Sequence, residues 1–184
     1  MRDLTENELA VVHDKLSKFI GEENIEKLIN REDDKYVFKY HNKKLLYIRE
    51  KIANQAVTFD RKEILFCGVC FGKFTSKEHK MQFKLSITSL DYLSVYCKHK
   101  VWVKDGAEDL FTRGNHVRKM DLSKMSDEVP QYAGVVVYNL KDLPLGFGAA
   151  AKSTLQCRTA DPGANVVFNY GDIGEYIRNE DALL

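Results

Sequence analysis

Residues 132–154 have the sequence YAGVVVYNLKDLPLGFGAAAKST, and this stretch decides the fold of the second half of the chain. Its β-branched run GVVVYN (134–139) predicts a buried strand. Residues 142–148 contain one proline and two glycines, which are typical of turns, so we expect a loop there. Two more strand-forming runs are KVWVK (100–104) and NVVFNY (165–170). Short strands separated by glycine-containing turns predict a small β-barrel-like domain.

The first half combines helical and strand patterns. Thr5 and Glu8 have the spacing of a capping box, which predicts a helix that begins there and ends at Gly21. The run KMQFKLSI (80–87) alternates apolar and polar residues, which predicts a strand with one buried face and one partly basic face. Further expected elements are strands at 36–41, 44–50 and 63–71 and a helix at 89–97. The first half is therefore predicted to be α+β, with helices flanking an antiparallel sheet.

Length and composition limit the class of protein. The 184 residues are enough for one medium domain or two small ones. No apolar run approaches the roughly 20 residues that a membrane helix requires, and the N-terminal MRDLTENELA lacks the features of a signal peptide. We therefore expect neither secretion nor a membrane partner. The four cysteines are then most simply free thiols.

The net charge of +1 hides an uneven distribution. Residues 1–34 carry a net charge of −5, residues 35–104 a net charge of +10 and residues 105–184 a net charge of −4. A basic middle between two acidic segments indicates a surface that faces a polyanion. The alternative, which charge alone leaves open, is that these lysines only solvate the outer face of a sheet.

The sequence contains no convincing enzyme motif. Cys67 and Cys70 form a C-x-x-C pair, but the other two cysteines stand alone, so two structural cysteines are favoured over a zinc or redox site. The glycines near Lys73 lack the spacing of a P-loop, and those near Phe147 lack the dinucleotide-binding register. No nucleophile elbow is present. We therefore expect no catalytic residue, metal or cofactor.

Nucleic-acid contact is the remaining candidate chemistry. Lys152 and Arg158 flank a small-residue stretch, and both cations are suited to phosphate. Ser153 and Thr154 add hydroxyl donors, and the alanines at 149–151 would allow a nucleic-acid backbone to approach closely. A second basic group, formed by Arg113, His116, Arg118 and Lys119, surrounds Gly114 and Asn115. For both groups, solvated surface charge remains the alternative.

Three motifs together resemble a PUA domain, a small pseudo-barrel found in many RNA-modifying and ribosome-assembly proteins. They are VWVKDGAEDLF-x-x-GNHV (101–117), YAGVVVYNLKDLPLGFGAAAKST (132–154) and VVFNYGDIGEYIR (166–178). With FGKF (71–74) and the junction at 90–104, the whole chain resembles the two-domain nuclear-import-protein-seven (Nip-seven) family of large ribosomal subunit assembly factors.

The resemblance implies an α+β domain at 1–94 followed by a PUA RNA-binding domain at 95–184 with a mixed β pseudo-barrel. It implies a non-catalytic factor for pre-ribosomal RNA processing and large (60S) subunit biogenesis, in the nucleus and nucleolus. The implied partners are single-stranded regions of pre-rRNA and other pre-ribosome assembly proteins, with the protein a monomer outside the pre-ribosome. Two alternatives stay open: a pseudouridine-synthase-like RNA-modifying enzyme with a PUA module, and a pure protein–protein adaptor.

The resemblance also places RNA along residues 114–119 and 144–158. It implies Lys152 and Arg158 as the main phosphate contacts and Asn115, His116 and Lys119 as secondary ones. The chain departs from the family pattern at Met120-Asp121-Leu122, where the family usually has a small residue and then a glycine. We expect Asp121 to strain the backbone if that glycine has positive φ, and to add negative charge beside Arg118 and Lys119.

Overall fold

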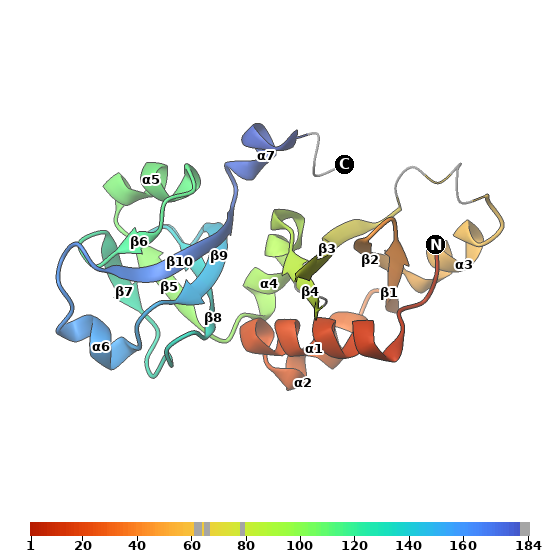
Figure 1. Cartoon of the computed structure of the whole chain (residues 1–184), viewed down its shortest axis with the longest axis horizontal. Coiled ribbons are helices and arrows are strands. Elements are labelled where there is room, and N and C mark those ends of the chain that lie inside the picture. The colour runs from red at the N-terminus through yellow and green to blue at the C-terminus, as the bar shows by residue number, and fades with distance from the viewer. Residues whose placement is uncertain (61–63, 65–66, 78–79, 181–184) are drawn as a thin grey trace. The chain divides into compact units, whose positions relative to one another are not determined.

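A computed structural model describes residues 1–60, 64, 67–77 and 80–180 of the chain (Figure 1). Its internal contacts divide the described residues into two compact units, Met1–Ser89 and Leu90–Glu180. Each unit has its own sheet. The predicted α+β class is confirmed, with an antiparallel sheet in the N-terminal unit and a mixed sheet in the C-terminal unit.

The N-terminal unit begins with two helices, α1 (Glu6–Ile20) and α2 (Glu22–Ile29). The predicted capping box is present: the Thr5 hydroxyl accepts from the N–H of Glu8, and the Thr5 N–H donates to the Glu8 carboxylate. Gly21 has φ +79° and separates the helices, because that φ is accessible to glycine without strain. The two helices bury an apolar stripe consisting of Val12, Leu16, Phe19, Ile20, Ile25 and Leu28.

The N-terminal sheet is antiparallel throughout, in the order β1-β2-β3-β4. Its strands are β1 (Tyr36–His41), β2 (Lys44–Arg49), β3 (Val69–Lys77) and β4 (Lys80–Leu85). The helix α3 (Glu50–Ala56) packs its buried Ala53 against Leu46, Ile48 and Cys70. The 3₁₀ turn η1 (Ile87–Ser89) ends the unit.

Two strand predictions in this unit have different outcomes. The hairpin is confirmed, since β1 and β2 are joined by Asn42 and Lys43, with φ of 48° and 63°. Positive φ at both central residues is the geometry of a type I′ turn, which suits the twist of a hairpin. The strand expected at 63–71 includes residues 63, 65 and 66, which lie outside the described part of the chain, and β3 begins at Val69.

The C-terminal unit is a six-stranded sheet in the order β6-β10-β9-β8-β5-β7 (Figure 1). Its strands are β5 (Lys100–Val103), β6 (Val117–Arg118), β7 (Leu122–Met125), β8 (Gly134–Tyr138), β9 (Pro144–Ala150) and β10 (Asn165–Asp172). Its helical elements are α4 (Leu90–Tyr96), η2 (Asp105–Ala107), α5 (Glu108–Thr112), α6 (Thr154–Arg158) and α7 (Glu175–Arg178). The pairing is antiparallel except between β5 and β8.

The predicted loop at 142–148 is wrong, because Pro144–Ala150 form the central strand β9. A Cβ at Gly148 would collide with the carbonyl oxygen of Phe168, and one at Gly146 would collide with that of Gly171. The two glycines therefore mark a close approach of β10 to β9 within the sheet, not a turn. None of the helices in the described ranges has the length and apolar character of a membrane span.

Candidate nucleic-acid interface

Lys119 and Lys152 lie at the same end of the C-terminal sheet, where β6 and β9 stop and β10 begins. Across β10, Asn165 pairs with Arg118 on β6, and Val167 pairs with Ala150 on β9. Just beyond the strands, the Lys119 N–H donates to the Ala164 carbonyl (2.9 Å) and the Ala151 N–H donates to the Val166 carbonyl (2.8 Å). The backbone hydrogen bonds thus hold the two lysine positions on either side of the start of β10.

The Cys157 thiol on α6 lies within Coulomb range of both ammonium groups. This thiol is 3% exposed, and burial raises its pKa. The positive charges of Lys119 and Lys152 act on the same pKa in the opposite direction. Such a Coulomb effect requires proximity. Lys119 and Lys152 therefore both lie near Cys157, in agreement with the backbone pairing.

The short helix α6 completes this basic group with Arg158. Ser153 caps the helix: its hydroxyl accepts from the Gln156 N–H (3.2 Å), and its own N–H donates to the Gln156 side-chain oxygen (2.9 Å). Lys152 precedes the cap and is half-buried, whereas Arg158 is the last helical residue and is exposed. Within the described residues, neither cationic group forms an ion pair.

Two expectations for the segment 149–158 are corrected. Thr154 does not offer its hydroxyl to a ligand, since it donates to the Ser126 carbonyl (3.0 Å) and accepts from the Val129 N–H (3.0 Å). The alanines at 149–151 are all buried, with at most 8% exposed. Their small size serves the packing of β9 against its neighbours rather than the close approach of a nucleic-acid backbone.

The second predicted group lies around a hollow of about 310 Å³ after α5, lined by Leu110, Asn115, His116, Arg118, Asp121 and Asn165. The Asn115 amide donates to the Leu110 carbonyl (2.9 Å) and so closes the end of α5. His116 accepts from the Asn169 N–H through Nδ1 (3.1 Å), and its ring meets Phe168 edge-on. Because Nδ1 is the acceptor, the ring hydrogen is on Nε2.

Charge at this second group is partly neutralised. Arg118 forms an ion pair with Asp121 (2.8 Å), and this hydrogen bond raises the pKa of the Arg118 guanidinium. Asp121 has no positive φ, so the expected backbone strain at the departure from the family pattern is wrong. Arg113 is exposed and makes no ion pair with any described residue. The basic group around Lys152 therefore has less opposing charge than the group around Arg118.

Sequence reasoning missed Asn169, which organises the second group. Its side-chain amide donates to the Phe111 carbonyl (3.0 Å) and to the Asp172 carboxylate (3.1 Å). Its backbone N–H donates to Nδ1 of His116. The partners Phe111 and His116 lie more than fifty positions away in the chain. No local pattern could have predicted a role that depends on β10 lying beside α5.

The cysteine pair and other metal-ligand types show no metal geometry in the described ranges. No group of three or more His, Cys, Asp or Glu is placed to hold an ion among those residues. Burial raises the pKa of both Cys67 and Cys70, and Cys70 belongs to the apolar cluster under α3.

Comparison with known proteins covers both units. Residues 1–87 match the family model described as NIP7/UPF0113, pre-PUA domain, and residues 99–181 match the UPF0113 PUA domain. A Xenopus tropicalis protein named 60S ribosome subunit biogenesis protein NIP7 homolog is 52% identical, over 100% of this chain and 99% of its own length. A Sus scrofa protein of the same name is 51% identical with the same coverage.

Solved structures show the fold as well. A crystal structure of a PUA domain from Aeropyrum pernix K1, as a tartrate complex, aligns with a TM-score of 0.59. The alignment covers 96% of this chain and 87% of that one at 11% identity. At so low an identity, this likeness shows a shared architecture and nothing further.

Proposed function

The chain belongs to the NIP7/UPF0113 family, and we propose that it is a non-catalytic, RNA-binding assembly factor for the large (60S) ribosomal subunit. The observation that carries this function is the 52% identity, across the full chain, to a relative named as a 60S ribosome subunit biogenesis protein. Both units take part in the match, so the comparison is not limited to a shared RNA-binding module.

RNA contact at Lys119, Lys152 and Arg158 is supported by their placement. These three cations come from two chain segments that the sheet brings together at the start of β10. Lysine and arginine at such an edge act on the phosphate backbone, which contributes affinity without reading sequence. Ser153 retains a hydroxyl hydrogen that can donate to a phosphate oxygen, because the helix cap uses that hydroxyl only as an acceptor.

Arg113, Asn115 and His116 form the secondary part of the proposed RNA surface. Arg113 is exposed, and His116 has an Nε2–H directed away from its bond to Asn169. The Asn115 side-chain nitrogen donates to the Leu110 carbonyl in α5, so the side-chain oxygen of Asn115 is left for a ligand. We expect these residues to contribute less than Lys152 because Asp121 lies beside them.

Absence of catalysis is part of the proposal and is supported by the names of the full-length relatives. A pseudouridine-synthase-like enzyme would produce modified uridines in ribosomal RNA incubated with the protein. We expect no such product.

We place the protein in the nucleus and nucleolus, with pre-rRNA and other assembly proteins as its partners. We expect it to be a monomer outside the pre-ribosome. Fluorescence microscopy of a tagged chain tests the localisation, and light scattering of the purified protein tests the oligomeric state.

The double variant Lys152→Ala/Arg158→Ala tests the RNA surface. Loss of two phosphate contacts at about 1 kcal/mol each weakens binding to a mixed-sequence single-stranded oligoribonucleotide about thirtyfold at low salt. It also reduces the slope of log K against log[KCl] by about 1.4. Fluorescence anisotropy measures both quantities.

The matched control is Lys124→Ala/Lys141→Ala, which removes the same charge from the C-terminal unit. Lys124 lies over the Trp102 ring, and the Trp102 side-chain N–H donates to Asp142, the neighbour of Lys141. The two control lysines therefore lie at the end of β8 and β9 that is opposite Lys152. We expect the control to change the salt slope by less than half as much. Equal losses in the two variants would contradict a localised RNA surface, and unchanged affinity in both would favour a protein–protein adaptor.

A further inference from the structure

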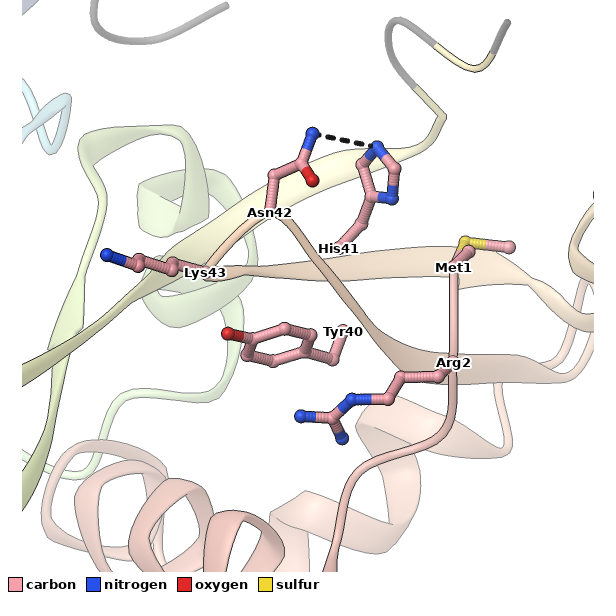
Figure 2. A pocket seen from close by; sticks show the side chains of 6 residues that line it. All are labelled: Met1, Arg2, Tyr40, His41, Asn42 and Lys43. Atoms are coloured by element: carbon pink, nitrogen blue, oxygen red, sulfur yellow. Dashed lines mark hydrogen bonds between the residues drawn. The ribbon is translucent and has the colours of Figure 1, made fainter. Parts of the chain in front are cut away.

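The N-terminal sheet has two edge strands, β1 and β4, and the chain itself pairs with the β1 edge. The Arg2 N–H donates to the Tyr40 carbonyl (3.0 Å), and the Tyr40 N–H donates to the Arg2 carbonyl (2.8 Å). Figure 2 shows the Arg2 side chain beside the Tyr40 ring, where the guanidinium lies 4.0 Å from the ring centroid. Lys39 on the same strand forms an ion pair with Asp3. The N-terminal segment therefore covers this edge of the sheet.

The β4 edge, in contrast, has backbone groups that point out of the sheet. The Ser86 N–H donates to the Phe71 carbonyl (3.0 Å), which marks a hydrogen-bonded pair between β4 and β3. Hydrogen-bonded and non-hydrogen-bonded pairs alternate along an antiparallel ladder. Because the register from Ser86 through β4 is continuous, Met81 and Phe83 belong to the second kind and direct their N–H and carbonyl groups away from β3. Among the described residues, these groups have no hydrogen-bond partner.

A groove of about 510 Å³ follows this open edge, between β4 and the helix α1 that contacts it. Its lining residues are Ala10, Val11, Asp14, Lys15 and Lys18 on α1 and Met81, Gln82 and Phe83 on β4. The Met81 side chain is 36% exposed in the groove, whereas Phe83 is buried. An open strand edge with room for alternate side chains is the arrangement by which PDZ and PTB domains bind an extended peptide as an additional strand.

The charges around the groove favour an acidic ligand. The α1 side has two lysines, Lys15 and Lys18, and one carboxylate, Asp14, which forms an ion pair with Lys18 (2.7 Å). On β4, Lys84 is exposed and forms no ion pair with any residue that the structure describes. The four strands of the sheet contain no acidic residue. Carboxylates on a ligand would therefore meet an excess of positive charge.

The two sides of β4 suit different side chains of a ligand. Successive residues of a strand point to opposite faces, so Met81 and Phe83 lie on the α1 side, and Gln82 and Lys84 lie on the other. A strand added beside β4 would place every second side chain against Met81 and Val11, and the side chains between them beside Lys84. The ligand that matches both sides alternates apolar and acidic residues.

We infer that the β4 edge binds an extended segment of another protein, with alternating apolar and acidic residues, as an antiparallel fifth strand of the sheet. A polypeptide is favoured over RNA because the edge alternates N–H donors with carbonyl acceptors, whereas a phosphate backbone only accepts. A second copy of the chain is disfavoured because β4 (KMQFKL) has two lysines and no acidic residue, so pairing through β4 would bring like charges together. The site goes beyond the proposed function, whose RNA surface belongs to the C-terminal unit.

The test uses the full chain and a fluorescein-labelled synthetic peptide in which valines alternate with glutamates, with binding measured by anisotropy. Directly opposed residues of antiparallel strands share a face, so the valines pair with Met81 and Phe83 and direct their N–H groups at β4. We expect N-methylation of the valines to weaken binding about thirtyfold, because two hydrogen bonds are lost. N-methylation of the glutamates, the matched control, leaves that edge of the peptide intact and should weaken binding by less than about threefold.

The substitution Met81→Pro tests the same edge from the protein side. Proline lacks the N–H that Met81 directs outward, and it removes no hydrogen bond to β3, which is the setting in which an edge strand tolerates proline. We expect peptide affinity to fall at least about tenfold, and to stay within about threefold in Met81→Leu, which keeps the N–H and an apolar side chain. If the proline variant does not fold, amide hydrogen exchange of the parent serves, since bound peptide should slow exchange at Met81 and Phe83.

Three outcomes would overturn this site. Equal binding of the two N-methylated peptides, or no binding of the unmodified one, would leave the β4 lysines only as protection of the edge against aggregation. A dimer that Met81→Pro dissociates would make a second copy the occupant. Slower exchange at Met81 and Phe83 with an oligoribonucleotide in place of the peptide would make RNA the ligand. The C-terminal RNA surface is tested separately by Lys152→Ala/Arg158→Ala, and we expect Met81→Pro to leave RNA affinity within about twofold.

Discussion

Replacing Glu8 with glutamine removes one charge that ties the N-terminal segment to both α1 and β1. Arg2 donates to the two Glu8 oxygens at 2.7 and 2.6 Å, and the Thr5 N–H donates to the same carboxylate at 2.8 Å. The Arg2 guanidinium also lies 4.0 Å from the Tyr40 ring centroid, and the backbones of Arg2 and Tyr40 exchange two hydrogen bonds. Glutamine can still cap α1, so the variant isolates the ion pair.

The expected magnitude follows from the pKa of Glu8. Its hydrogen bond to Arg2 is the main reason that this pKa falls from 4.5 to about 2. One pKa unit corresponds to about 1.4 kcal/mol, so the full shift would stabilise the charged, folded state by about 3 kcal/mol. The Arg2 side chain is 39% exposed, and solvent screening reduces this to about 1–2 kcal/mol.

The sign of the pH dependence follows from the direction of the shift. A carboxylate whose pKa is lowered by folding contributes stability above its unfolded value, and that stability is lost as the pH falls toward the folded value. For Glu8 the window runs from 4.5 down to about 2. The difference between parent and Glu8→Gln is therefore full at about pH 7 and shrinks steadily below about pH 4.5.

Urea denaturation of the full chain measures this difference. The single tryptophan, Trp102, belongs to the C-terminal unit, so its fluorescence follows that unit, while far-ultraviolet circular dichroism follows both. We expect Glu8→Gln to shift the dichroism transition and to leave the fluorescence transition unchanged. Glu6→Gln, an exposed acid in the same helical turn, is the control. If Glu8→Gln lowered the free energy of unfolding by the same amount at low and at neutral pH, the ion-pair explanation would be refuted.

Two further substitutions test the packing that positions the C-terminal surface. Gly148→Ala places a Cβ against the Phe168 carbonyl, and we expect it to lower the free energy of unfolding, measured by Trp102 fluorescence, by about 3 kcal/mol. The control is Gly163→Ala, because a Cβ there meets nothing within 4 Å, and we expect it to change that free energy by less than about 0.5 kcal/mol. Equal effects would contradict the close approach of β10. Thr154→Val removes the two hydrogen bonds of that hydroxyl and is expected to cost about 2 kcal/mol in the same assay. RNA affinity of the folded variant should stay within about twofold, because Thr154 is structural and does not contact phosphate.

The features that could be predicted from sequence are those specified by neighbouring residues. The Thr5–Glu8 capping box and the Asn42-Lys43 hairpin depend on residues a few positions apart, and both form as expected. The alternation at 80–87 also holds where β4 packs: Phe83 and Leu85 are buried and Gln82 and Lys84 are exposed. In each case local periodicity or turn chemistry determines the structure without help from distant segments.

Features that depend on distant pairing could not be predicted. Gly146 and Gly148 have the composition of a loop, and only the approach of β10 shows that they are strand residues. The strands β6 and β7 and the helix α6 were not expected, since they are short and their sequences have weak periodicity. The placement of Lys119 and Lys152 at one end of the sheet likewise requires the β6-β10-β9 order, which no local pattern contains.

The chemistry of the proposed RNA surface has a consequence for how RNA would be selected. In the C-terminal unit, Thr154, Asn115 and Asn169 direct their hydrogen-bonding groups mainly to the protein itself, so the groups left for RNA are chiefly cations. Cations that contact phosphate contribute affinity but do not read base edges. This surface should therefore bind single-stranded RNA with little sequence preference and with a strong dependence on salt.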